Sequence, residues 1–169
     1  FTMLFRLCRV DGSSMRKTLE NGQMLITTSV GEPEPGDIIV FSMTTDSPYY
    51  DLNEALVKRV IAKGGDVVNI DYQAGTVSVN GEVLQEAYIA EPTYLGYDVT
   101  FPYTVPEGTV FVMGDNRNHS ADSRYAPLGC VDESRILGRV LLRILPGRQT
   151  NEEGDVVGGR DFRRIGAVS

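Results

Sequence analysis

Several residue types are scarce in this chain of 169 residues, and their scarcity narrows what it can do. Tryptophan is absent, and histidine occurs once, as His119. The two cysteines, Cys8 and Cys130, lie far apart and form no CxxC motif, which excludes the usual cysteine- and histidine-based structural metal sites. We therefore expect no metal ion or other cofactor. Buried free thiols are the expected state of the cysteines, with a disulfide between them as the alternative.

Positive charge and long apolar runs are also in short supply. The chain carries 16 Lys and Arg against 23 Asp and Glu, a formal net charge of −7. Because phosphate binding needs a basic face, this balance argues against nucleic acid as a partner and against electrostatic attachment to anionic lipid. No run approaches the ~18 apolar residues of a membrane-spanning helix. We interpret the start at Phe1, rather than at methionine, as the sign of a truncated or processed fragment, so the lack of an anchor does not describe the full-length protein.

What the chain has in quantity are glycines, 18 of them, and the strand formers Val, Ile, Thr, Tyr and Phe. This combination predicts a mainly β protein with many turns and little helix. Asn80-Gly81 predicts a tight hairpin turn, because both central residues of such a turn take positive φ. Apolar runs bounded by turn residues predict strands at Phe1–Val10, Gln23–Val30, Ile38–Ser42, Ala55–Lys63, Asp66–Ile70, Thr76–Val79, Glu82–Leu84, Thr109–Met113 and Ile136–Leu145.

The length is suited to one sizeable core. We expect one domain over residues 1–146, with a small β-hairpin lobe inserted at about 66–105. Residues 147–169 are Gly-rich and polar and are predicted to form a loosely held C-terminal tail.

The first predicted strand has one apolar face, formed by alternate residues at Phe1, Met3, Phe5 and Leu7. Ordinary core packing is one interpretation of this face. The other is an exposed apolar edge that rests on a membrane surface.

The most polar loop of the chain is Gly114–Arg124, which reads GDNRNHSADSR and directly follows the apolar strand Thr109–Met113. Such a loop cannot bury itself by hydrophobicity, so its charged, hydroxyl and amide groups must satisfy one another. This predicts a rigid, hydrogen-bonded loop, and an ordinary solvated surface loop is the alternative.

The same loop resembles the last signature box of the type I signal peptidases, the membrane-bound serine proteases that remove secretory signal peptides. Ser14–Leu19 (SMRKTL), Gly22–Ile26 (GQMLI) and Val57–Ile61 (VKRVI) resemble the family's other boxes in the same order, so that the resemblance covers most of residues 10–146. It implies an antiparallel β fold of coiled sheets or a partial barrel, and a serine–lysine dyad. It also implies the signal-peptide region of preproteins as substrate, and a location at the cell membrane with the catalytic domain on the extracytoplasmic side.

Ser14 is the nucleophile that the resemblance implies. From the residues alone, the segment Asp11–Met15 is a turn before a strand, and nothing distinguishes Ser13 from Ser14. The family motif, a serine followed by methionine, selects Ser14. This chain departs from the family at Lys17, where proline is usual, and at Gly12, where some members carry a serine that helps bind the oxyanion. We therefore expect the oxyanion site at Gly12 and Ser14, with the Ser14 N–H as its donor.

Lys58 is the expected general base. On the predicted strand, Leu56, Lys58 and Val60 share one face, so Lys58 has apolar neighbours. Burial disfavours the ammonium ion and lowers the pKa of a lysine until the neutral amine can accept a proton near neutral pH. From the residues alone, a surface lysine that extends into solvent is the alternative. The resemblance places the base at Lys58, and a Ser-His-Asp triad through His119 is the competing arrangement.

The resemblance also implies supporting residues in the polar loop. Ser120 matches the family serine that hydrogen-bonds the lysine, and a hydroxyl orients an amine without raising its pKa as a carboxylate would. Asp122 and Arg124 are expected as a supporting ion pair. The loop is expected to be held in place by Asp115, Asn116 and Arg117. Shallow apolar pockets for small substrate side chains are expected at Met15, Leu19 and Leu56.

Two other functions compete with this one. Self-cleaving repressors also use a Ser-Lys dyad, but they need a DNA-binding module and a cleavable linker upstream of the serine, and too few residues precede Ser14. A non-catalytic β module that binds extended peptides is disfavoured by the joint presence of Ser14, Lys58 and Ser120. The chain ends in the small-x-small pattern Ala167-Val168-Ser169, and a further hypothesis is that this end occupies a neighbouring molecule's cleft as a product mimic. The sequence gives no indication of the oligomeric state.

Overall fold

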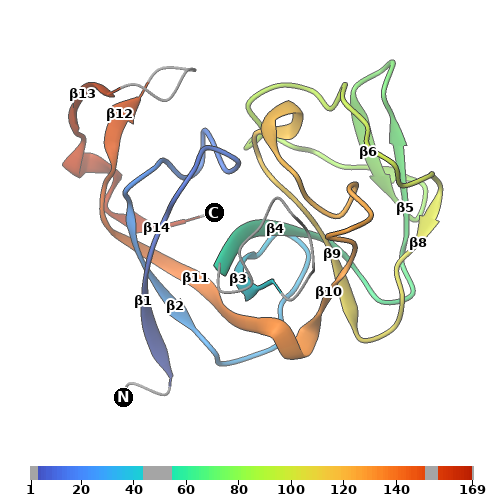
Figure 1. The fold of residues 1–169 in the computed structure, drawn as a ribbon, viewed down its shortest axis with the longest axis horizontal. Helices are drawn as coiled ribbons and strands as arrows, with labels where there is room; N and C mark the ends of the chain where they lie inside the picture. Colours follow the sequence, from blue (N-terminus) through green and yellow to red (C-terminus); the bar gives the residue numbers. More distant parts are fainter. Residues whose placement is uncertain (1–3, 44–54, 151–155, 169) are drawn as a thin grey trace.

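The computed structural model describes residues 4–43, 55–150 and 156–168, which Figure 1 draws as a ribbon. Antiparallel strands dominate these residues, and the only helical elements among them are three single 3-10 turns. The strands are β1 (Phe5–Arg9), β2 (Met24–Thr28), β3 (Ile38–Ser42), β4 (Ala55–Lys63), β5 (Val67–Asp71), β6 (Thr76–Val79), β7 (Glu82–Val83), β8 (Tyr103–Thr104), β9 (Thr109–Met113), β10 (Val131–Asp132), β11 (Ile136–Leu145), β12 (Arg148–Thr150), β13 (Val156–Arg160) and β14 (Gly166–Ala167). The 3-10 turns are η1 (Arg117–His119), η2 (Glu133–Arg135) and η3 (Phe162–Arg164). The predicted mainly β fold is confirmed.

The main sheet has the strand order β1-β2-β11-β3-β4-β9-β10, with β14 also paired to β11. β11 is its longest strand, with β2 along one edge and β3 and β14 along the other. Register shifts in the pairings of β11 bend the sheet, because an unpaired residue adds local twist. In Figure 1 the sheet curls from β1 at the left to β9 at the right and does not close.

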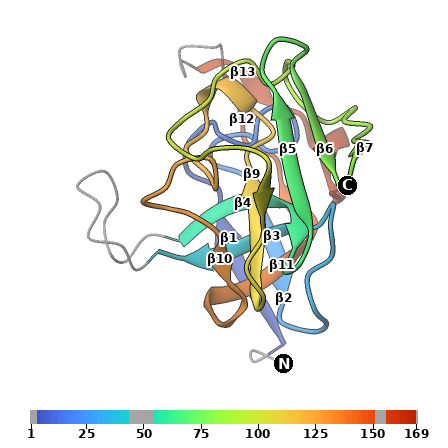
Figure 2. The same cartoon turned by 90° about the vertical axis from the view of Figure 1, so that its right-hand side faces the viewer.

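A second sheet, in the order β7-β6-β5-β8, lies against one side of the main sheet. Figure 2 shows β5, β6 and β7 in front of β4 and β9. The two sheets share an apolar core, in which Val68 and Val77 of the second sheet pack with Ile61 and Phe111 of the main one. All strands of the second sheet fall within residues 66–105. The division into a main domain, an inserted lobe and a loosely held tail stays a prediction.

The predicted strands agree closely with those of the structure. Five of them coincide with β3, β4, β6, β9 and β11, and the others differ at one or both ends. The hairpin at Asn80-Gly81 is confirmed, with φ of 52° and 86° at the two residues. The short strands β8 and β10 and the tail strands β12, β13 and β14 were not predicted, because two or three residues between turns carry no readable alternation.

The apolar face of the first strand is exposed where the structure describes it. Leu7 is 66% exposed and Phe5 is 39% exposed on the edge strand β1, whereas Phe1 and Met3 lie outside the described residues. Leu7 stands opposite Ile26, which stands opposite the exposed Leu142, so the apolar surface continues across three strands. These observations favour the exposed edge over core packing.

Neither a disulfide nor a membrane-spanning helix is present in the part of the chain that the structure describes. Cys8 and Cys130 are both half-buried free thiols, and burial raises the pKa of each. No helix in residues 4–43, 55–150 and 156–168 has the length and apolar character needed to cross a bilayer.

Candidate active site

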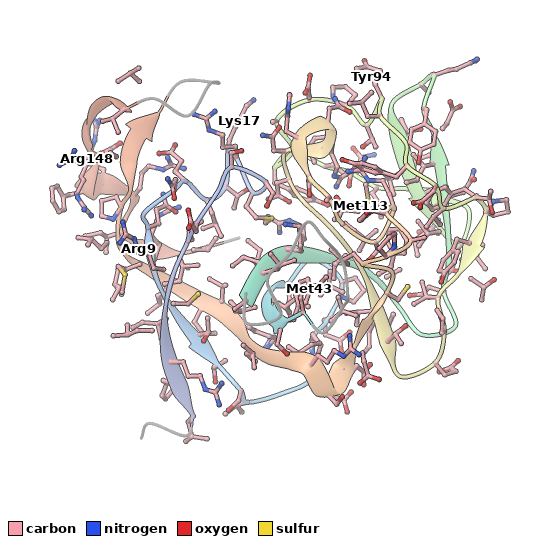
Figure 3. All side chains as sticks on the ribbon, viewed as in Figure 1. Arg9, Lys17, Met43, Tyr94, Met113 and Arg148 are labelled. Carbon is pink, nitrogen blue, oxygen red and sulfur yellow. The ribbon has the colours of Figure 1, made fainter. Side chains whose placement is uncertain are left out.

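Ser14 lies in the segment that links β1 to β2, here called the Ser14 turn (residues 11–20). Gly12 has a φ of +89°, a conformation that side chains rarely adopt, so the absence of a side chain favours this turn. Within the turn, the N–H of Leu19 donates to the carbonyl of Met15 at 2.8 Å. Figure 3 labels Lys17 at the upper end of this segment.

Lys58 meets Ser14 from the middle of β4. Its Nζ lies 2.7 Å from Ser14 Oγ and 3.3 Å from the carbonyl oxygen of Val57. The residue is only 4% exposed, which excludes the surface-lysine alternative in this structure. As the alternation along the strand predicted, Leu56 and Val60 pack in one cluster with Ile39, the residue opposite Lys58 on β3.

The environment of the Lys58 amine favours its neutral form. Burial lowers its pKa from 10.5 to about 8, and the more distant Asp122 carboxylate opposes this shift only in part. Among the described residues no carboxylate forms an ion pair with Lys58. The amine is therefore a base that is substantially neutral at mildly alkaline pH and is already in contact with the Ser14 hydroxyl.

The polar loop Gly114–Arg124 is internally bonded, as predicted. Arg124 Nε lies 2.8 Å from Asp122 Oδ1, and both side chains are fully buried. Arg124 also donates to the carbonyl of Arg117 at 2.6 Å, and Asp122 accepts from the N–H of Gly114 at 3.0 Å. These bonds fix the loop to the end of β9, where Figure 3 labels Met113.

The polar loop also holds the Ser14 turn. Asn116 N–H donates to the carbonyl of Ser14 at 2.9 Å, and Asn116 Nδ2 donates to the carbonyl of Ser13 at 3.1 Å. A Cβ added at Gly114 would lie 2.5 Å from the Ser14 carbonyl oxygen, so only glycine allows this close approach. The loop therefore sets the position of the Ser14 backbone.

Asp115 ties three segments together. Its carboxylate accepts from Arg59 Nε at 2.9 Å and Nη2 at 2.8 Å, and also from the hydroxyl of Thr18. The Arg59 guanidinium in turn lies 3.9 Å from the centre of the Tyr88 ring. Neither Arg59 nor Thr18 was singled out from the sequence. The sequence did offer one signal for Arg59, because it is a charged residue next to Lys58 in an otherwise apolar strand.

Arg117 also has a buried carboxylate partner, Glu86. Its Nη1 lies 2.9 Å from Glu86 Oε2 and 3.1 Å from Thr93 Oγ1, and its Nε donates to the carbonyl of Gly114 at 3.0 Å. Glu86 lies in the irregular segment after β7, and no sequence signal identified it as a partner.

Of the polar-loop residues, Ser120 differs from the expectation, whereas His119 takes no part in the competing triad. Ser120 is 2% exposed, yet its Oγ makes no hydrogen bond with any described residue, so the expected bond to Lys58 is absent. Ser120 Oγ instead faces Gly114, where an added Cβ would lie 2.2 Å away. His119 is exposed on η1, and Lys58 occupies the place next to Ser14 that a triad histidine would need.

The expected pocket residues divide between two clusters. Met15 and Leu19 are fully buried in the Met15 cluster, whereas Leu56 packs in the cluster of Val60. Val57, the neighbour of Leu56, packs against the Met15 cluster. The Met15 cluster consists of Val10, Met15, Leu19, Leu25, Ile38, Val40 and Val140, with Cys8, Val57, Leu137 and Val168 packed against it.

No metal site accompanies these residues in the described part of the chain. Within it, no group of three or more His, Cys, Asp or Glu side chains is arranged to hold a metal ion.

Comparison with known proteins gives consistent matches. Residues 1–145 match the family described as "Signal peptidase, peptidase S26". "Probable signal peptidase I-2" of Synechocystis sp. is 38% identical over 141 residues, which cover 81% of this chain and 62% of that protein. "Signal peptidase I" of Bacillus amyloliquefaciens is 39% identical over 146 residues, which cover 80% of this chain and 71% of that protein. The crystal structure of a signal peptidase I from Enterococcus faecalis V583 aligns with a TM-score of 0.51 and 32% identity over 66% of this chain and 98% of that one.

Proposed function

The chain belongs to the signal peptidase family, peptidase S26, and we propose that it is the catalytic part of a signal peptidase I, a serine endopeptidase that removes N-terminal signal peptides from secreted preproteins. The observation that supports this proposal most strongly is the 2.7 Å contact between Lys58 Nζ and Ser14 Oγ. Since the chain spans 62% of the length of the Synechocystis relative, the activity of the whole protein is part of this proposal.

In the proposed first step, Ser14 Oγ attacks the carbonyl carbon of the scissile peptide bond. The neutral Lys58 amine accepts the hydroxyl proton as the new C–O bond forms. The negative charge on the former carbonyl oxygen is stabilised by the N–H of Ser14, and Gly12 contributes no side-chain donor. Collapse of this intermediate breaks the C–N bond, the Lys58 ammonium gives its proton to the departing amine, and an acyl-enzyme remains.

The second step uses the same groups in the same order. Lys58 is neutral again and takes a proton from a water molecule that attacks the acyl carbon. The intermediate then expels Ser14 Oγ, which regains a proton from the Lys58 ammonium. The signal peptide leaves with a new carboxylate at its C-terminal end.

The polar loop has a supporting role in this proposal. Asn116 fixes the Ser14 backbone, and Asp115 joins the Ser14 turn to β4 through Thr18 and Arg59. Their positions restrict the distance between hydroxyl and amine, which matters because catalysis falls steeply when reacting groups move apart. The pairs of Arg117 and Arg124 hold the rest of the loop, and Ser120 fills the space beside Gly114.

The proposed substrate pocket lies at the Met15 cluster. Met15 directly follows Ser14 in the chain, Leu19 lies in the same turn, and Val57 of β4 packs against the cluster that contains both. Val57 therefore takes the place in the pocket that was expected of Leu56. A shallow apolar pocket of this kind admits small side chains and excludes large ones by volume. The exposed edge at Phe5 and Leu7 is the surface we propose for contact with the membrane, on its extracytoplasmic side.

Cleavage of a synthetic signal peptide by the wild type, Ser14→Ala and Lys58→Ala tests the proposal. We expect both variants to lose at least about 1,000-fold in kcat/KM, as in other serine proteases that lose a member of the catalytic unit. Ser13→Ala and Lys63→Ala are matched controls, because they change a serine of the same turn and a lysine of the same strand that do not join the Ser14–Lys58 contact. Equal turnover by the wild type and both dyad variants would refute the mechanism.

A further inference from the structure

The end of the described chain returns to the Ser14 turn. We call Asp161–Val168 the tail segment; it contains η3 and β14. β14 pairs antiparallel with β11, with Ala167 opposite Leu142 and Gly166 opposite Arg143. At these positions β2 takes the other edge of β11, so β14 extends the edge that β3 occupies at residues 136–139. Figure 1 shows β14 beside β11.

The last described residue is seated in the proposed substrate pocket. Val168 packs against the Met15 cluster, to which Met15 and Leu19 belong, and Val57 and Cys8 pack against the same cluster. An extended strand with an apolar side chain in this cluster is the form in which a peptide substrate would bind, with main-chain bonds to a strand edge and side chains in pockets.

Two arginines fasten the tail segment to the Ser14 turn. Arg164 Nη2 donates to the carbonyl of Lys17 at 2.8 Å, and Arg164 Nη1 pairs with the Glu20 carboxylate. Arg143 of β11 bridges the two segments, because its Nη1 donates to the carbonyl of Thr18 at 2.9 Å and its Nε donates to the carbonyl of Arg164. These contacts fix the position of the tail segment against the Ser14 turn.

The open space beside the Ser14 turn is walled by the same residues. A pocket of about 270 Å³ lies there, and neither Ser14 nor Lys58 lines it. Its walls come from the Ser14 turn, the segment after β7, β11 and the tail segment, through Lys17, Thr18, Ala87, Tyr88, Arg143, Arg164, Ala167 and Val168. A peptide that reached Met15 by this route would have to displace the tail segment.

From this arrangement we propose that the tail segment is a built-in competitor, which occupies the substrate groove of its own chain and must leave before a signal peptide can bind. The proposal rests on the proposed function, which makes the Met15 cluster the substrate pocket. The tail segment lies outside residues 1–145, the range that matches the family model. The sequence suggested that the C-terminal end occupies the cleft of a neighbouring molecule. In this proposal Ala167 and Val168 instead occupy the groove of their own chain. Ser169 lies outside the described residues.

Self-occupancy has a defined kinetic signature. A groove that is free only a fraction of the time raises the apparent KM by the inverse of that fraction, and a tail bound nine-tenths of the time raises it about tenfold. The kcat at saturating substrate is unaffected, since a bound substrate has already displaced the tail. A residue that merely stabilised the fold would not produce this split between KM and kcat.

The test measures kcat and KM on a synthetic signal peptide with the full chain carrying Arg164→Ala or Val168→Asp. Arg164→Ala removes the two contacts to the Ser14 turn, and Val168→Asp places a carboxylate in the apolar seat. The matched control is Arg163→Ala, because Arg163 neighbours Arg164 but its side chain is 92% exposed and pairs with Asp161 of its own turn. We expect KM to fall about tenfold in both tail variants with kcat unchanged, and to equal the wild-type value in the control.

A second measurement does not depend on turnover. In the Ser14→Ala protein, we expect saturating signal peptide to speed hydrogen exchange at the amides of Ala167 and Val168, because the peptide displaces β14. Cleavage with KM unchanged in both tail variants, or β14 amides that stay equally protected with peptide bound, would overturn the competitor and leave the proposed function intact. Absence of cleavage by the wild type and every variant would instead overturn the proposed function.

Discussion

The buried basic side chains on the two sides of the active site differ in whether a carboxylate pairs with them. On the polar-loop side, every buried guanidinium among the described residues has a carboxylate partner, in the pairs Arg59–Asp115, Arg117–Glu86 and Arg124–Asp122. On the Ser14 side, the buried amine of Lys58 contacts a hydroxyl and a backbone carbonyl, and no carboxylate of the described residues pairs with it.

The difference shows how one site can hold both paired guanidinium groups that fix the structure, here called the frame, and an unpaired amine that suits the proposed role of Lys58 as base. A paired guanidinium stays charged and fixes its neighbours, which suits residues that position the Ser14 turn. An unpaired amine in the same buried setting loses its proton more readily, which suits a group that must accept one. Each arrangement would fail in the other's place. An unpaired arginine would be a buried charge without a partner, and a paired lysine would stay protonated at neutral pH and could not accept a proton.

The largest effect is expected when an arginine, like those of the buried ion pairs, replaces Lys58, the proposed base. Lys58→Arg keeps the charge but cannot become neutral, and its guanidinium would lack a carboxylate. We expect kcat/KM to fall at least about 1,000-fold and the free energy of unfolding to fall by about 3–5 kcal/mol. Peptide cleavage and urea unfolding measure the two effects. An active Lys58→Arg enzyme would show that proton acceptance by residue 58 is not required.

The converse change removes a carboxylate from the frame. Asp122→Asn leaves the fully buried Arg124 without a counter-charge, and we expect a loss of about 3–5 kcal/mol in the free energy of unfolding. Urea denaturation at pH 7 measures it. Asp161→Asn, which breaks the exposed pair with Arg163, is the control and is expected to leave the free energy of unfolding unchanged. Equal behaviour of the two variants would mean that burial of the Arg124 pair does not matter to the fold.

A smaller effect is expected on stability, where the destabilisation caused by burying the Lys58 amine can be measured separately from its role in catalysis. In the folded chain the pKa of Lys58 is about 8, against 10.5 for a free lysine, so the unfolded chain binds more protons between these values and wild-type stability rises as pH rises from about 8 to 10.5. Lys58→Met has no amine to protonate. Below pH 8 we expect it to be more stable than the wild type by up to about 3 kcal/mol, with the difference shrinking toward pH 10.5.

Urea unfolding of Lys58→Met and the wild type at pH 6 and pH 10 measures this difference in stability, and the variant is expected to be inactive at both values. A Lys58→Met protein that is less stable than the wild type at pH 6 would show that the buried amine does not carry the expected cost.

The smallest effect is expected at Ser120. Its buried Oγ makes no hydrogen bond with a described residue, so Ser120→Ala removes no bond and leaves no new unsatisfied group. We expect the free energy of unfolding to change by less than about 1 kcal/mol. Activity should rise with pH as Lys58 loses its proton, and this rising limb of the pH–rate profile should stay at the same pH in the variant. A shift of that limb would reveal a Ser120–Lys58 hydrogen bond during turnover.

The sequence predicted the parts of the molecule that depend on local pattern. Alternation located β4 and placed Leu56 and Val60 beside Lys58 on one face, and both pack together in the structure. The choice of Ser14 over Ser13 came from the family resemblance rather than from local pattern. The pocket assignment of Leu56 stays a prediction: Leu56 packs with Val60, whereas Val57 packs against the Met15 cluster.

Other features could not be predicted from local pattern, because they depend on contacts between distant segments. Glu86 and Arg117 are 31 residues apart, and nothing near Glu86 indicates a buried carboxylate. Arg164 and Glu20 are 144 residues apart, and they bring to the Ser14 turn a tail that composition alone describes as polar and Gly-rich. Such pairs form only after the strands have set the distances between segments.

The most direct test of the unpaired base is the titration of the lysine side chains. The chain has three lysines, so labelling lysine Cε with ¹³C gives three NMR signals, and Lys58→Met assigns the one of interest. Lys63, half-buried at the end of the same strand and hydrogen-bonded to Glu34, is the internal control, because that bond raises its pKa above the ordinary value of 10.5. We predict that Lys58 titrates near pH 8 while Lys63 titrates above 10.5. A Lys58 signal that titrates together with Lys63 would contradict a neutral amine at Ser14.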